Sequence, residues 1–216
     1  MDAIIIVLVI GVVVGGVFLV LHLREKKRTE EISVVAAEMD LPFYAQGDAS
    51  LISELSNFPL FSEGRSKKIK NMLHGETSDV EVGVFDYRYT IHSGKHNHVY
   101  KQTVAFIRSP QLDCSEFALR PENLFDKIGG VFGFQDIDFE SRPRFSSSYL
   151  LRGNSEYRIR TLFTDTVLAF FENEPGFSVE GYGQQIIFYR ASKRVKPEDI
   201  RSFFEEAFRA YTLFKD

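Results

Sequence analysis

The first two dozen residues constrain this chain most, because no residue from 3 to 21 is charged or more polar than glycine. At about 1.5 Å of rise per residue, such a segment forms a helix of roughly 28 Å, close to the thickness of a bilayer's hydrocarbon core. A cleaved signal peptide is the alternative, but the basic n-region and small-residue cleavage site that it needs are missing. The sequence therefore predicts a transmembrane anchor over residues 1–23.

The charges next to this segment predict its orientation. The segment is followed directly by four basic residues and one acidic residue, Glu25. The basic residues are Arg24, Lys26, Lys27 and Arg28. Because positive charge is retained on the cytoplasmic side, we expect a single-pass protein of a bacterial inner membrane, with the N-terminus outside and the C-terminal domain in the cytoplasm. The same four residues are expected to lie at the membrane surface.

Within the apolar segment, Gly11 and Gly15 are spaced four residues apart. Small residues at this spacing let two membrane helices approach closely, which predicts a homodimer through this helix. The alternative is that glycine is simply common in apolar helices of this kind.

Composition bounds the rest of the chain. The segment that follows residue 28 carries a net charge of −6, since residues 1–28 carry +2 and the whole chain −4. An acidic domain is a poor nucleic-acid ligand, because phosphate contacts need a basic surface. The single cysteine, Cys114, excludes an internal disulfide and agrees with a reducing compartment.

The clearest strand pattern lies in residues 83–91 and 99–108, where apolar and polar residues alternate. Residues 92–98 between them contain Gly94 and predict a long hairpin loop. Shorter strands are expected at 117–120, 135–140, 149–151, 177–180 and 185–190, and helices at 121–130, 155–163 and 165–172.

The C-terminal segment predicts the best amphipathic helix of the chain. Pro197 can begin it, and one apolar stripe follows: Ile200, Phe203, Phe204, Ala207, Phe208, Tyr211 and Phe214. The predicted fold class is therefore α+β. An N-terminal transmembrane helix and a juxtamembrane helical and linker region (24–57) precede one cytoplasmic domain (58–216) of mostly antiparallel strands with packed helices. Residues 58–61 are expected to clip onto its core.

Two groups of residues are candidates for metal chemistry. His92, His96 and His98 share one predicted loop and could offer three imidazoles to zinc. However, rigid elements suit such a site better than a loop.

The second group projects from one face of a predicted strand: Asp136, Asp138 and Glu140. These carboxylates could hold Mg²⁺ or Ca²⁺ or supply an acid and a base. The alternative is that they are the solvated face of an edge strand.

A basic stretch after the predicted clip contains Arg65, Lys67, Lys68 and Lys70. Beside a membrane anchor these residues are candidates for contact with anionic headgroups. The alternative is an ordinary solvated face.

Several strings in the chain resemble a known group of sequences. They are Phe85-Asp86-Tyr87-Arg88-Tyr89, Gln102-Thr103-Val104, Leu119-Arg120-Pro121-Glu122-Asn123 and Asp136-Ile137-Asp138-Phe139-Glu140. With them the chain resembles bacterial single-pass membrane-anchored hypothetical proteins of unknown function. Residues 145–164 distantly resemble the DUF 3137 group. The resemblance implies a bacterial origin and no known activity, so it supplies no catalytic residues.

These observations favour a membrane-tethered interaction module that binds a protein or lipid surface at the inner leaflet, without a cofactor. Its expected partners are the bilayer and a protein still to be identified. The alternative is a membrane-associated, metal-dependent enzyme that uses the acidic strand face. No motif of a known catalytic or nucleotide-binding class is present, which favours the first hypothesis.

Overall fold

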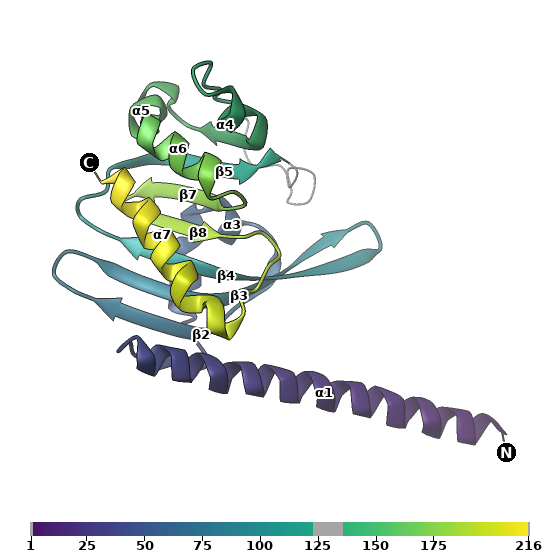
Figure 1. Cartoon of the computed structure of the whole chain (residues 1–216). Coiled ribbons are helices and arrows are strands. Elements are labelled where there is room, and N and C mark those ends of the chain that lie inside the picture. The colour runs from purple at the N-terminus through teal and green to yellow at the C-terminus, as the bar shows by residue number, and fades with distance from the viewer. Residues whose placement is uncertain (1, 123–135, 216) are drawn as a thin grey trace.

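The computed structural model describes residues 2–122 and 136–215, with side chains described from residue 10 onward. Within these residues the fold is built on an eight-stranded antiparallel sheet in the order β1-β2-β3-β4-β8-β7-β5-β6 (Figure 1). The strands are β1 Phe43–Tyr44, β2 Arg65–Glu76, β3 Glu81–Ser93, β4 His96–Arg108, β5 Cys114–Pro121, β6 Tyr149–Gly153, β7 Ser178–Gly183 and β8 Gln185–Tyr189. The helices are α1 Asp2–Glu38, α2 Ser50–Glu54, η1 Leu55–Asn57, α3 Pro59–Ser62, α4 Pro143–Ser148, α5 Glu156–Leu162, α6 Asp165–Asn173, η3 Pro197–Asp199 and α7 Ile200–Phe214.

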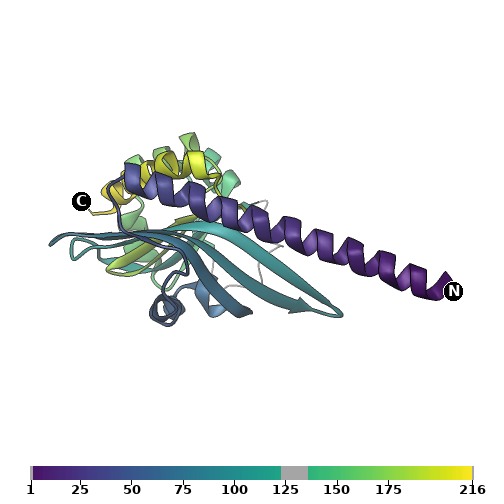
Figure 2. The ribbon, with the colours of Figure 1, turned by 90° about the horizontal axis from the view of Figure 1, so that it is seen from below.

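The sheet separates two apolar cores. The larger core lies under α1, α5, α6 and α7, and the smaller one lies on the opposite face under α2, η1 and α3 (Figure 2). Alternation along β3 supplies both cores, because Val84 faces the larger one while Phe85 and Tyr87 face the smaller one. The strand alternation expected from the sequence is therefore confirmed.

The β3–β4 hairpin is longer than the sequence predicted. Its pairing continues without a break to Ser93 opposite His96, so only Gly94 and Lys95 remain for the turn. Gly94 has a φ of 59°, the left-handed conformation that a two-residue hairpin turn needs. The predicted loop at 92–98 is therefore mostly strand.

The predicted fold class must be corrected at its first element. α1 is one unbroken helix from Asp2 to Glu38. In the described part of the chain, no helix has the length and apolar character to cross a membrane. The prediction of a transmembrane helix is wrong on this finding, and the orientation inferred from it loses its premise.

Two other predicted elements differ. The helix expected at 121–130 falls largely outside the described residues. The strand expected at 135–140 is reduced to one isolated bridge, between Asp136 and Arg152. Ile137 and Phe139 are nevertheless buried and their acidic neighbours exposed, so the predicted alternation is present without the ladder.

The predicted clip at residues 58–61 is present and has a polar anchor. Phe58 and Phe61 are buried in the smaller core. Between them the Leu60 backbone N–H donates to Glu180 Oε2 at 3.0 Å. Glu180 is fully buried and pairs with Arg120 at 3.1 Å, so this face of the sheet also contains a buried ion pair.

The amphipathic helix at the C-terminus is confirmed as α7, but its apolar stripe is only partly buried. Phe203 and Phe214 are buried, whereas Phe204 and Phe208 are half-buried at the edge of the larger core. Phe203 stacks on Phe177 with ring centroids 5.8 Å apart. The helix is thus part of the core. Fewer of its aromatic rings are fully buried than the apolar stripe in the sequence suggests, so fewer of them contribute strongly to the stability of the domain.

Replacing one ring on each side of this boundary tests the assignment. Phe203→Ala should lower the free energy of unfolding by about 3–5 kcal/mol, because it removes a fully buried ring. Phe204→Ala, on the same helix, should lower it by clearly less. Urea unfolding followed by circular dichroism measures both, and equal losses would contradict the packing described here.

Candidate functional site

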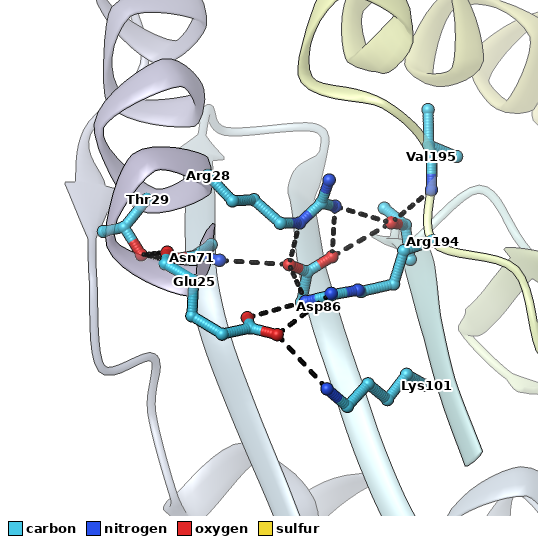
Figure 3. Close-up of polar contacts among 9 residues, drawn as sticks. Glu25, Arg28, Thr29, Asn71, Asp86, Lys101, Arg194 and Val195 are labelled. Carbon is cyan, nitrogen blue, oxygen red and sulfur yellow. Dashed lines mark hydrogen bonds and ion pairs between the residues drawn. The ribbon is translucent and has the colours of Figure 1, made fainter. Parts of the chain in front are cut away.

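Asp86 on β3 is the centre of a polar cluster between α1 and the sheet (Figure 3). Arg28 donates from Nε to Asp86 Oδ2 and from Nη2 to Oδ1, each at 2.7 Å. Asn71 Nδ2 and Thr103 Oγ1 each donate to the same carboxylate at 3.0 Å. Asp86 is only 7% exposed, so these four donors replace the water that a carboxylate requires.

The cluster joins α1, three neighbouring strands and the segment that follows β8. Thr29 Oγ1 on α1 donates to Asn71 Oδ1 on β2 at 2.8 Å. Thr103 Oγ1 on β4 accepts from the Val195 backbone N–H, which lies between β8 and η3, at 3.0 Å. α1 is therefore held on the sheet by a connected network as well as by the buried side chains of Ile32 and Ala36.

One turn before Arg28, Glu25 is held by two cations. Its carboxylate accepts from Arg194 Nη1 at 2.8 Å and Nη2 at 3.0 Å, and from Lys101 Nζ at 3.2 Å. The hydrogen bonds from Arg194 are the largest effect, and together with Lys101 they lower the pKa of Glu25 to about 2 although partial burial acts in the opposite direction. Glu25 is therefore ionised at any physiological pH.

A cavity of about 180 Å³ opens beside these residues. Five cationic and two anionic side chains contribute to its wall, which leaves an excess of positive charge. Its lining residues are Glu25, Lys68, Lys70, Asn71, Asp86, Tyr87, Arg88, Lys101 and Arg194. We call it the basic pocket.

Three of the cations lie directly across neighbouring strands. The register places Lys68 on β2 opposite Arg88 on β3, and Arg88 opposite Lys101 on β4. Like charges directly opposite each other destabilise a sheet. Within the described residues, the side chains of Lys68, Lys70 and Arg88 make no hydrogen bond or ion pair. The basic pocket is therefore suited to bind an anion.

The structure divides the basic stretch predicted from the sequence. Lys68 and Lys70 line the basic pocket, but Lys67 Nζ donates to the Phe61 backbone carbonyl and Arg65 Nη2 donates to Asn97 Oδ1 at 3.0 Å. Strand alternation and the irregular pairing of β2 with β3 separate these side chains. Half of the predicted patch thus belongs to the candidate site.

The three histidines are not brought together. His92 Nδ1 lies 3.0 Å from Asn97 Oδ1, its cross-strand partner, and the rings of His96 and His98 are 6.5 Å apart. Among the residues that the structure describes, no group of three His, Cys, Asp or Glu side chains is arranged to hold a metal ion.

The acidic residues after the undescribed segment are exposed. Asp136 pairs with Arg152, and the Asp138 backbone carbonyl accepts from Arg160 Nη1 at 2.9 Å. Glu140 is exposed in a turn. Their roles in catalysis or metal binding stay predictions.

Gly11 and Gly15 lie on the part of α1 that extends beyond the sheet. An added Cβ at either position would meet no atom within 4 Å, so both are accessible in the single chain. Dimerisation through this helix stays a prediction.

Sequence reasoning missed most of the candidate site. The sequence assigns Arg28 to a membrane flank together with Arg24, Lys26 and Lys27, but the Arg28 side chain is only 11% exposed and pairs with Asp86, whereas its three neighbours are exposed. The sequence nevertheless contains a signal for the site. Asp86 and Arg88 are two residues apart on a predicted strand, so both charged side chains lie on the same face of the hairpin.

Comparison with known proteins gives a fold and no family. No family model matches this sequence, and no curated protein matches it. The fold has a solved counterpart. The crystal structure of the mycobacterial trehalose monomycolate transport factor A is similar, with a TM-score of 0.64 and 12% sequence identity, covering 88% of this chain and 93% of that chain. An identity this low shows a shared fold, and the resemblance to the DUF 3137 group stays a prediction.

The contribution of the Arg28–Asp86 pair can be measured directly. Arg28→Met should lower the free energy of unfolding by about 3 kcal/mol or more, because it removes the guanidinium that binds both oxygens of a buried carboxylate and leaves only one cation, Arg194, 4.0 Å away. Lys27→Met removes the same charge from an exposed neighbouring position and should change stability by less than about 0.5 kcal/mol. Urea unfolding of both variants tests the difference, and equal midpoints would show that the pair does not hold α1 in place.

Proposed function

We propose that this protein is a binding module that associates with a lipid surface, in which the basic pocket receives an anionic headgroup. The observation that carries the proposal is the order of features along α1. The continuous run of exposed apolar side chains ends at Leu23, and the wall of the basic pocket begins at Glu25. A segment that enters the apolar layer of a bilayer would therefore hold the pocket at headgroup level.

The apolar part of α1 lies beyond the cover of the domain. Figure 2 has α1 leaving the sheet and projecting past it on the side of the β3–β4 hairpin. Large side chains between 47% and 75% exposed cover all sides of this projection: Ile10, Val12, Val13, Val14, Val17, Phe18, Leu19, Val20, Leu21 and Leu23. Apolar surface on this scale marks a site of interaction with a lipid or a protein.

Charge favours the lipid surface. Leu23 and Glu25 are only about 3 Å apart along the helix axis. Arg24, Lys26 and Lys27 surround this point, and the unpaired cations of the basic pocket lie beside it. Each Lys or Arg near an anionic membrane surface adds about 1 kcal/mol of attraction.

Size favours binding over catalysis. Pockets for whole small-molecule substrates usually enclose about 300–1,000 Å³, whereas the basic pocket encloses about 180 Å³ and suits a compact group. Its carboxylates are already held by cations and do not form an acid and base pair. The similarity to a transport factor for trehalose monomycolate, a lipid, is compatible with a non-catalytic role.

Vesicle flotation of the full chain tests the proposal. The protein should bind neutral phosphatidylcholine vesicles through α1, and should bind vesicles with about 30% phosphatidylglycerol more tightly at low salt than at high salt. The variant Lys68→Gln/Arg88→Gln should lose on the order of tenfold in affinity for the anionic vesicles and nothing for the neutral ones.

The matched control is Arg144→Gln/Lys215→Gln, which removes two exposed charges outside the pocket and should bind like the wild type. If both double variants lost affinity equally, the effect would come from net charge and the pocket would have no headgroup role. If the wild type bound neither kind of vesicle, the lipid surface would be excluded and α1 would have to bind a protein.

A further inference from the structure

Glu25 occupies the basic pocket in the way an anionic ligand would. Its two carboxylate oxygens take donors from Arg194 and Lys101 at 2.8–3.2 Å, while Lys68 and Arg88 in the same pocket wall make no such contact. The Glu25 carboxylate thus pairs with two of the five cations in the pocket wall. An incoming anion must either share these two cations or displace Glu25 from them.

Displacement of Glu25 would leave α1 in place. Arg28 remains bound to Asp86, Thr29 to Asn71, and Arg201 Nη2 donates to the Glu38 backbone carbonyl at 2.7 Å. Glu25 is also partly exposed, so its carboxylate can turn to solvent without being buried unpaired. The contacts of Glu25 are therefore dispensable for folding in a way that those of Arg28 are not.

We propose that Glu25 is a built-in competitor for the ligand of the basic pocket, and that the ligand class able to displace it is a phosphate monoester. The inference rests on the proposed function, since it concerns the same pocket. In this proposal a ligand must displace the Glu25 carboxylate in order to bind. Lys101 and Arg194 then bind the ligand in place of Glu25.

Charge arithmetic gives the selectivity. A phosphate diester carries one negative charge, as the Glu25 carboxylate does. When it replaces Glu25, Lys101 and Arg194 therefore pair with the same negative charge as before. A phosphate monoester carries close to two charges above its second pKa near 6, and it has three terminal oxygens. The additional charge and oxygen can reach the unpaired Lys68 and Arg88, so only the monoester gains from the exchange.

Calorimetric titration of the full chain in neutral detergent, at low ionic strength, tests the inference. The probes are glycerol 1-phosphate, a monoester, and glycerophosphoglycerol, a diester. The wild type should bind the monoester more tightly. Glu25→Gln should bind both probes more tightly, by up to about fivefold for a partly exposed pair, because neither probe then has to displace a carboxylate from Lys101 and Arg194.

The matched control is Glu30→Gln, which makes the same change of charge on the same helix, outside the pocket wall, and should bind like the wild type. If Glu25→Gln bound both probes as Glu30→Gln does, the competitor role would be overturned and the proposed function would stand. If neither the wild type nor Glu25→Gln bound either probe, the headgroup role of the pocket would be overturned as well.

The pH dependence tests the assigned ligand class separately from the role of Glu25. The groups that face Glu25 are Lys101 from β4, Arg194 before η3 and Asp86 from β3, and no histidine lines the pocket. Because the pKa of Glu25 is about 2, it keeps its charge between pH 5 and 7.5. Wild-type affinity for glycerol 1-phosphate should therefore fall as the pH falls through 6, while affinity for the diester stays constant. An equal fall for both probes would contradict the assigned ligand class.

Discussion

Arg28 and Asp86 meet where the long N-terminal helix crosses the sheet, and the geometry of the basic pocket depends on that contact. An apolar helix on an apolar sheet can shift along its axis at little cost, because apolar contacts are not directional. A bidentate pair with both oxygens bound to one guanidinium allows a single position. A buried pair of this kind contributes little net stability, and its best-attested use is to fix register. Here it fixes the register of α1 on β3.

The rest of the site follows from this register. With Arg28 fixed, Glu25 lies one turn earlier and reaches Lys101 and Arg194, and the exposed apolar residues begin immediately before it. A shift of α1 by one residue would turn Glu25 by about 100° around the helix and remove it from the pocket. The buried carboxylate on β3 therefore controls both the charge of the pocket and the position of the projecting part of α1.

The sequence predicts those parts of the fold that depend on local periodicity. The strands around Tyr87 and Val104, the clip at Phe58 and Phe61, and the stripe of α7 are all recognisable because their burial pattern repeats within a single element. The candidate site is not local, since Arg28 and Asp86 are 58 residues apart and Glu25 and Arg194 are 169 residues apart. Counting charges next to an apolar segment cannot separate Arg28, whose side chain is 11% exposed, from Lys27, whose side chain is 75% exposed. The same limit applies to Lys67 and Lys68, because only the pairing of β2 decides which face each one occupies.

Each face of the sheet has a buried carboxylate that binds the segment covering it, but the consequence differs between the two faces. In the smaller core, the Glu180 carboxylate pairs with Arg120 and accepts hydrogen bonds from Tyr189 Oη and the Leu60 backbone N–H. Its charge is fully buried beneath the short covering helix α3. On the α1 side, Asp86 is buried in the same way, but the covering helix continues past the sheet and carries Glu25 to the surface. A charge that is completely enclosed can only hold its cover in place. A charge at the edge of the cover is held by cations that have unpaired neighbours, and another anion could replace it there. This difference supports the proposal that the α1 side of the sheet binds an anion, whereas the buried pair on the other side has a structural role.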